Sequence, residues 1–313
     1  MSAVLPEVSF GLIKRPQSYE ELSEREHFSA PLDHTAHALR EVLTDYHFAR
    51  EVPCGLKSCR QPHKHGFLVM TEDGAETNIG QRCGKTHFGE EVFSRARSEY
   101  TRRREREELV ARAKQIQALA PDISRSITDL IQRTFGAKWA MRVTGELAAV
   151  IGEDAVESLR LSTIRDDLAV TTTRRRSERE IEDFMAANRG ASRERATYED
   201  QVIGRLQPAS WLNFDFRARL VMDLQGPLSE FKELVVDAMA SPKLKAQVKR
   251  FDGYEQVLEA ASDATSSALR FLAAENLELV GLWLPPHSKD RAGKLREWVN
   301  GEAYRSLLEG ASK

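Results

Sequence analysis

The feature that most constrains this chain is the clustering of its cysteines. All three cysteines of the 313-residue chain lie between residues 54 and 83. Cys54 and Cys59 form a C-x4-C pair, and Cys83 begins a C-x3-H pair that ends at His87. Zinc is bound tetrahedrally by four sulfur or imidazole-nitrogen ligands, and pairs of ligands on tight turns supply them. The spacing therefore predicts a metal site around which this part of the chain folds.

The segment between the two pairs has the pattern of a β-hairpin. Two short runs, residues 66–70 and 75–79, flank the dipeptide Asp73-Gly74. Asp-Gly is a favoured turn dipeptide, so we expect the chain to run out and back. Such a hairpin returns the second ligand pair to the first, at the point where a helix is expected to begin.

A cysteine turn, a hairpin and a ligand pair at a helix start resemble the treble-clef type of zinc finger. The resemblance covers only about residues 50–97. It implies a metal-nucleated module of a kind often used to bind nucleic acid or protein. The first pair departs from the commonest pattern, because four residues rather than two separate its cysteines, and a histidine takes the fourth place.

One Zn²⁺ ion is the expected cofactor, and its expected ligands are Cys54, Cys59, Cys83 and His87. His63 and His65 are alternatives for the fourth position, since both follow the first pair closely enough to reach back. Three cysteines and a histidine form a closed site, which argues for a structural rather than a catalytic metal. The competing interpretation is three reduced, buried thiols with surface histidines nearby.

Composition predicts a soluble, mainly helical protein. Charged residues make up 30% of the chain, and no apolar run approaches the roughly eighteen residues that span a bilayer, so no membrane partner is expected. The formal net charge is −2, so any nucleic-acid surface must be local. The chain shows no signal-peptide pattern and no spare cysteines, which predicts a reducing, cytoplasmic location without disulfides.

Helical periodicity and proline positions suggest the domain organisation. The expected parts are an N-terminal segment 1–52 with one helix over residues 33–48, a zinc module 53–97, a long antiparallel helical stalk 98–206 with a tip at 121–170, and a helical C-terminal domain 207–313. The expected C-terminal helices cover residues 229–239, 242–251 and 254–274, with a last helix around 295–308; the apolar run 277–284 is expected to be a lone strand or a buried connector.

The stalk prediction depends on two charged segments. Residues 89–120 and 173–206 are both rich in arginine and glutamate, and we expect Pro121 to end the first helix. Their similar lengths predict an antiparallel pair. The heptads are too imperfect for a regular coiled coil.

Basic side chains in and after the zinc module are candidates for nucleic-acid contact. Residues 54–106 contain eleven Lys or Arg against seven Asp or Glu. The candidate contact residues are Lys57, His63, Lys64, His65, Arg82, Lys85, Arg102, Arg103, Arg104 and Arg106. The competing interpretation of the arginine-rich helices is a solvated face with i,i+4 pairs to glutamate.

A binding protein is expected rather than an enzyme. The chain contains no phosphate-binding glycine loop, nucleophile elbow or H-E-x-x-H motif. The carboxylates near the hairpin tip, Glu72, Asp73 and Glu76, are expected to be solvated turn residues. Nucleic-acid association through the zinc module and the adjoining helix is the leading hypothesis. A protein-binding adaptor or inhibitor that uses the stalk and the C-terminal domain is the alternative, and the sequence leaves self-association open.

Overall fold

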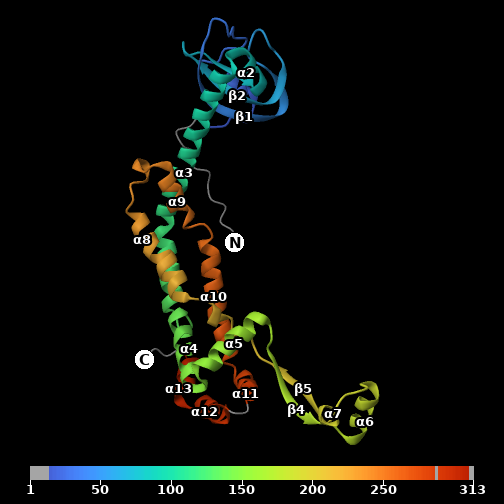
Figure 1. Ribbon diagram of the computed structural model, residues 1–313. Helices are drawn as coiled ribbons and strands as arrows, with labels where there is room; N and C mark the ends of the chain where they lie inside the picture. Colours follow the sequence, from blue (N-terminus) through green and yellow to red (C-terminus); the bar gives the residue numbers. More distant parts are fainter. Residues whose placement is uncertain (1–13, 286–287, 310–313) are drawn as a thin grey trace. The chain divides into compact units, whose positions relative to one another are not determined.

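The structure is a computed structural model that describes residues 14–285 and 288–309. The predicted mainly helical fold with a small N-terminal hairpin module is confirmed (Figure 1). The described residues divide into two compact units, one formed by residues 14–118 and 234–249 and the other by the remainder. Within the described ranges, no helix is both long enough and apolar enough to cross a membrane.

The first unit is built on a three-stranded antiparallel sheet. Its strands are β1 (Leu39–Pro53), β2 (Pro62–Thr71) and β3 (Glu76–Gly80), in the order β1-β2-β3. The β2–β3 hairpin turns at Asp73-Gly74 as predicted, and Gly74 has a φ of 87°, which glycine adopts most easily. The helices that flank this sheet in the sequence are α1 (Tyr19–Ser23), α2 (Gln81–Phe88) and the N-terminal part of α3 (Glu90–Gln132). Phe93 of α3 packs into the sheet core with Val42, Val69 and Ile79.

The predicted helix over residues 33–48 is wrong, because most of this segment forms β1. The register of β1 against β2 shifts after Leu39, after Val42 and again after His47. Such irregularities interrupt the two-residue alternation of a strand. The apolar residues therefore fall at intervals of three and four, which imitates a helix.

The prediction that Pro121 ends the first charged helix is also wrong. Helix α3 runs from Glu90 to Gln132 with Pro121 inside it. Its buried stripe continues past the proline at alternating intervals of three and four: Ala113, Ile116, Ala120, Ile123, Ile127 and Leu130. Burial of this stripe offsets the backbone hydrogen bond that proline cannot donate.

The second unit is mainly helical and carries a β-hairpin. Its first helices are α4 (Ala137–Ile151) and α5 (Glu153–Arg165). A hairpin of β4 (Ala169–Arg175) and β5 (Tyr198–Arg205) follows, with α6 (Glu178–Ala187) and α7 (Arg193–Thr197) at its far end (Figure 1). The predicted helix 173–206, and with it the antiparallel stalk, is therefore wrong. Three consecutive β-branched threonines, residues 171–173, favour the strand, and Gly190, with a φ of 96°, lies between the two short helices.

The C-terminal elements pack around large aromatic residues. They are η1 (Ser210–Asn213), η2 (Arg217–Gln225), α8 (Gly226–Lys232), α10 (Tyr254–Phe271), α11 (Ala274–Trp283), α12 (Lys289–Asn300) and α13 (Glu302–Leu308). The rings of Trp211 and Phe271 lie 5.0 Å apart in this core. The lone strand considered for residues 277–284 is wrong, because α11 buries Leu277 and Val280 one turn apart and leaves Leu282 exposed.

One piece of the C-terminal half belongs to the first unit. Residues 234–249 contain η3 (Val236–Ala238) and α9 (Ser241–Lys249). The guanidinium of Arg106 on α3 donates to the carbonyl oxygens of Val236 and Asp237 at 3.1 and 3.0 Å. Lys114 adds an ion pair to Asp237 at 2.9 Å. An arginine of α3 therefore fixes a segment 130 residues away in the sequence.

Candidate metal centre

The three cysteine sulfurs converge in the first unit. The Sγ atoms of Cys54, Cys59 and Cys83 all lie within 4.8 Å of one another, and those of Cys59 and Cys83 are 3.1 Å apart. Sulfurs around a tetrahedral zinc ion, with bonds of about 2.3 Å, are separated by about 3.8 Å. The three side chains can therefore hold one metal ion together.

Residues 54–61 form the cysteine turn, which carries the first two sulfurs, and backbone hydrogen bonds fix its shape. The amide of Cys54 donates to Gln61 O at 3.0 Å, and that of Cys59 donates to Leu56 O at 3.2 Å. Arg60 follows with a φ of 56°, in the left-handed region that reverses the chain tightly. The turn accommodates the four-residue spacing of the first pair and still brings its two sulfurs together.

The sheet and α2 supply the third sulfur. The amide of Gly55 donates to the carbonyl oxygen of Asn78 on β3 at 2.7 Å, which joins the cysteine turn to the hairpin. Strand β3 leads directly into α2, whose third residue is Cys83. Gly84 lies so close to Phe93 that a Cβ there would be 2.6 Å from the ring. Helix α2 is therefore held closely against α3.

Burial disfavours the charged form of two of the thiols. It raises the pKa of Cys83 to about 12, and it also raises the pKa of Cys54. Thiols in such surroundings are inert, whereas a bound cation deprotonates a coordinating thiol outright. Cys59 differs, because burial is outweighed by hydrogen bonds with the Gln61 backbone and with Cys83, which lower its pKa and favour the thiolate that a metal binds. Three closely spaced sulfurs suit metal binding better than nucleophilic catalysis.

Two histidines lie at the rim of the cysteine cluster, although neither joins the sulfurs within 4.8 Å. His87 follows Cys83 by one turn of α2, and its Nδ1 is 3.5 Å from Ser58 Oγ in the cysteine turn. His34 was not among the sequence candidates. Its Nδ1 is 3.2 Å from the same hydroxyl, and its ring centroid is 4.7 Å from that of His87. The fourth ligand position therefore has two nearby imidazoles.

The alternatives His63 and His65 lie against other residues of the described chain, His63 through hydrogen bonds and His65 through a ring contact only. His63 Nε2 is 2.7 Å from the hydroxyl of Tyr46, and its Nδ1 is 3.2 Å from Gln61 O. Burial lowers the pKa of His63. The ring of His65 lies 3.8 Å from that of His47. These contacts favour His87 over both as a ligand.

We expect His87→Gln to lower the affinity of the protein for zinc by at least about a hundredfold, since even changes beyond the direct ligands cost up to that factor. His65→Gln is the matched control and should change the affinity by no more than a few fold. Competition with a chromophoric chelator measures both. A large loss for His34→Gln with none for His87→Gln would assign the fourth position to His34 instead.

Four of the candidate nucleic-acid contacts are exposed and either unpaired or only weakly paired, whereas a fifth, Lys85, is held in an ion pair. Lys64, Arg82 and Arg102 are exposed and make no ion pair or side-chain hydrogen bond within the described chain. The Nζ of Lys57 is 3.9 Å from a carboxylate oxygen, while that of Lys85 is 2.6 Å from one. The first four of these cations are therefore available to an external anion.

The remaining three arginine candidates on α3 bind within the protein. Arg103 and Arg104 donate to carboxylates at 2.8 and 2.9 Å, the second to Glu108 in an i,i+4 pair. Arg106 donates to the two backbone carbonyls of residues 236 and 237. These three guanidinium groups stabilise the fold, so they are poor probes of nucleic-acid binding.

Sequence reasoning missed Arg60. It is exposed, without an ion-pair partner in the described residues, and it follows Cys59 directly. Arg82 directly precedes Cys83, whose sulfur is 3.1 Å from that of Cys59. Two unpaired arginines therefore flank the sulfur cluster. The signal in the sequence was an arginine adjacent to a cysteine in each ligand pair.

Glu76 was expected to be a solvated turn residue, and the structure corrects this. Its side chain is 7% exposed and receives two hydrogen bonds from Arg25, at 2.5 and 3.0 Å. Hydrogen bonding to Glu76 raises the pKa of Arg25. The pair joins the N-terminal segment to β3.

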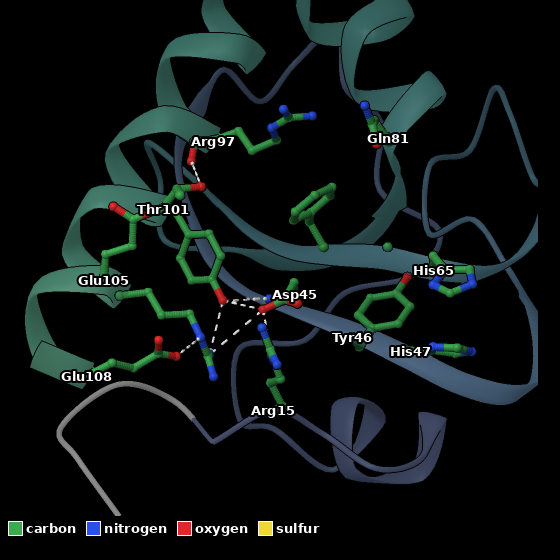
Figure 2. Close-up of a pocket in the computed structure, with 14 residues that line it drawn as sticks. Arg15, Asp45, Tyr46, His47, His65, Gln81, Arg97, Thr101, Glu105 and Glu108 are labelled. Atoms are coloured by element: carbon green, nitrogen blue, oxygen red, sulfur yellow. Dashed lines mark hydrogen bonds and ion pairs between the residues drawn. The ribbon is translucent and has the colours of Figure 1, made fainter. Parts of the chain in front are cut away.

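A polar network joins β1 to α3 and to Arg15 of the N-terminal segment (Figure 2). The hydroxyl of Tyr100 on α3 donates to Asp45 Oδ1, which also accepts from Arg15 Nε at 2.9 Å. Arg104 Nη1 donates to the Tyr100 hydroxyl at 3.2 Å. The charge of Asp45 is therefore compensated by two arginines, and the hydrogen bonds of Tyr100 and Arg15 outweigh burial and lower its pKa. This network forms one end of a cavity between the sheet and α3.

No protein-family model, curated protein or solved structure matches this chain.

Proposed function

We propose that this protein is a non-enzymatic binding protein whose zinc-stabilised module contacts nucleic acid. The proposed zinc ligands are Cys54, Cys59, Cys83 and His87. The order of cysteine turn, β2–β3 hairpin and ligand-bearing α2 supports a treble-clef type of finger. A structural metal is proposed because the three sulfurs are packed into the first unit and the fourth place has an imidazole beside it. Thiolate ligands suit a reducing compartment, and we propose the cytoplasm.

The observation that carries the nucleic-acid proposal is the pair of unpaired arginines beside the sulfur cluster. Arg60 and Arg82 are exposed and have no carboxylate partner in the described chain. Lys57 lies in the same cysteine turn as Arg60, and Lys64 lies at the start of β2. Each phosphate that such a side chain neutralises releases counterions, so a few contacts give measurable binding at low salt.

The test replaces both arginines by glutamine, which keeps side-chain length and removes the charge. The variant Arg60→Gln/Arg82→Gln should lose about tenfold or more in affinity at low salt, and the slope of log affinity against log salt should fall by about 1.5. Its melting temperature should be unchanged, because exposed side chains without partners contribute little to stability. Fluorescence anisotropy with mixed-sequence DNA and RNA at several salt concentrations is the measurement.

The matched control is Arg189→Gln/Arg217→Gln in the second unit. These arginines are also exposed and without partners in the described chain, so the control makes the same change in net charge. It should keep the affinity and the salt slope. Equal losses in the two double variants would mean that only the total charge matters. No binding by the unaltered protein at low salt would reject the proposal.

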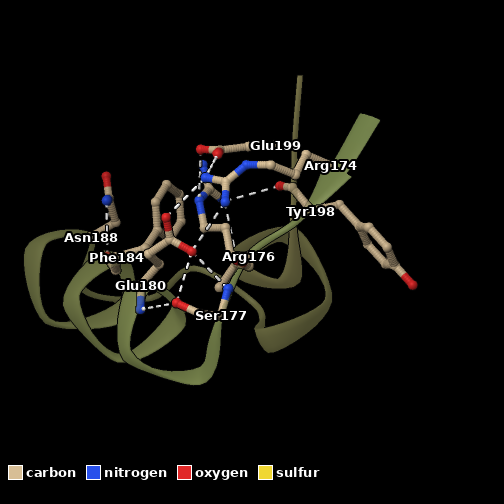
Figure 3. A network of polar contacts seen from close by, with 9 residues as sticks. Arg174, Arg176, Ser177, Glu180, Phe184, Asn188, Tyr198 and Glu199 are labelled. Atoms are coloured by element: carbon tan, nitrogen blue, oxygen red, sulfur yellow. Dashed lines mark hydrogen bonds and ion pairs between the residues drawn. The ribbon is translucent and has the colours of Figure 1, made fainter. Parts of the chain in front are cut away.

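A protein partner is the second candidate function, and the β4–β5 hairpin favours it. Its arginines are engaged internally: Arg174 pairs with Glu180 and Glu199, and Arg176 donates to Glu199 at 3.0 Å and lies over the ring of Phe184 (Figure 3). In contrast, β5 exposes three large apolar or aromatic side chains: Tyr198, Val202 and Ile203. A hairpin that pairs its charges and exposes apolar side chains suits a protein surface better than a phosphate backbone. Failure of nucleic-acid binding would make this adaptor-type function the leading one.

A further inference from the structure

A cavity of about 680 Å³ opens in the first unit between the sheet and α3. Residues 45–47 of β1, Gly66 and Phe67 of β2, the first residue of α2 and one face of α3 form its walls (Figure 2). Pockets for small ligands generally enclose about 300–1,000 Å³. The cavity is therefore large enough for a nucleotide-sized molecule.

The two ends of this cavity differ in their polar groups. Arg15, Asp45, Tyr100 and Arg104 satisfy one another at one end. Away from this network, four polar side chains that line the cavity make no hydrogen bond or ion pair within the described chain: Arg97, Gln81, His47 and His65. Figure 2 shows Arg97 and Gln81 across the cavity from Arg15 and Glu108. Unused donors and acceptors that converge on a cavity are groups available to a ligand.

The same cavity contains an aromatic surface. Phe67 is only partly buried, and its ring meets Phe93 edge-on at 5.7 Å, which holds it in place. A planar base can stack on such a ring, and base–aromatic stacking does not depend on the identity of the base. An amide such as Gln81 carries both a donor and an acceptor, as the edge of a base requires.

We propose that this cavity binds one nucleotide, with the base against Phe67 and the phosphate at Arg97. The proposal rests on the nucleic-acid function proposed above and names its ligand as a nucleoside monophosphate, either free or as one unit of a single strand. A monophosphate fits the charge better than a triphosphate, because Glu105 and Glu108 line the same cavity. An acidic peptide would leave the aromatic ring and the amide unused.

The experiment compares Arg97→Gln with Arg95→Gln. Arg95 lies two residues earlier on α3, is exposed and does not line the cavity, so it is a matched control for the charge change. The probes are adenosine, cytidine, guanosine and uridine 5′-monophosphates, with adenosine, inorganic phosphate and a hexaglutamate peptide for comparison. Isothermal titration calorimetry measures the affinity of the zinc-loaded full chain for each of these probes. Arg97→Gln should weaken monophosphate binding by at least about tenfold, since a hydrogen bond to a charged group is worth such a factor. Arg95→Gln should leave it unchanged, and adenosine and phosphate alone should bind more weakly than the monophosphates.

The outcomes separate this proposal from the function on which it rests. If a labelled single strand binds but no monophosphate displaces it and the two α3 variants behave alike, the cavity proposal is wrong and the nucleic-acid function stands. If monophosphates bind with the expected loss in Arg97→Gln while strands do not bind, the cavity takes free nucleotides and the nucleic-acid function is wrong. Tighter binding of the peptide than of any monophosphate would overturn the cavity proposal in favour of an acidic protein segment.

Discussion

Replacing Cys83 with serine is expected to abolish the proposed zinc binding and to unfold the sheet-containing part of the first unit. Cys83 is the proposed ligand that would join α2 to the cysteine turn, and its sulfur lies 3.1 Å from that of Cys59. Zinc binding provides on the order of 10 kcal/mol of apparent free energy in isolated fingers, which exceeds half of the stability of most domains. Loss of one of its thiolates should therefore leave this small module without enough stability to fold.

Two measurements check this prediction. Elemental analysis of the purified protein should find one zinc per chain, and none in Cys83→Ser. Hydrogen exchange of the amides of β2 and β3 should become fast in the variant, as it should when a chelator removes the metal from the unaltered protein. Ser98→Ala, an exposed change on α3, is the control and should alter neither result. A metal-free protein with protected β2 and β3 amides would instead identify three buried, reduced thiols.

The sequence allowed prediction of features that depend on neighbouring residues. The turn at Asp73-Gly74 depends on the conformational freedom of glycine within the turn itself, and the hairpin formed where expected. The cysteine cluster was also predictable, because the hairpin necessarily returns Cys83 to the first pair. Local patterns of this kind are visible in a few consecutive residues.

Features that depend on distant residues were missed. Strand β1 was taken for a helix, because its irregular pairing with β2 is invisible until the partner strand is known. The β4–β5 hairpin was taken for a charged helix, although Arg174 pairs with Glu199 directly across the two strands. Arg106 was considered either a nucleic-acid contact or part of a solvated face, since nothing near it in the sequence indicates residues 236 and 237 as its partners. Charged residues in particular reveal little about burial until their partners are placed.

Glu76 is the clearest such case and leads to the second large effect. Its partner Arg25 is 51 residues away in the sequence. Arg25→Ala is expected to lower the free energy of unfolding of the first unit by about 3 kcal/mol, because it leaves a carboxylate that is 7% exposed without its cation. This value is the lower end of the range for a broken buried pair, since the side chain of Arg25 itself is 30% exposed.

Hydrogen exchange of the β2 and β3 amides in the zinc-loaded protein measures this fall in unfolding free energy for the first unit alone. A fall of about 3 kcal/mol corresponds to amide exchange that is faster by about two orders of magnitude. Arg40→Ala is the control, because its only ion pair in the described chain, to Glu41 at 4.0 Å, is at the surface. The double variant Arg25→Ala/Glu76→Gln separates the buried charge from the lost contacts. It removes the unpaired carboxylate and should recover a large part of the protection. Equal exchange rates in the single and double variants would show that the contacts of Arg25, and not the buried charge, hold the N-terminal segment on β3.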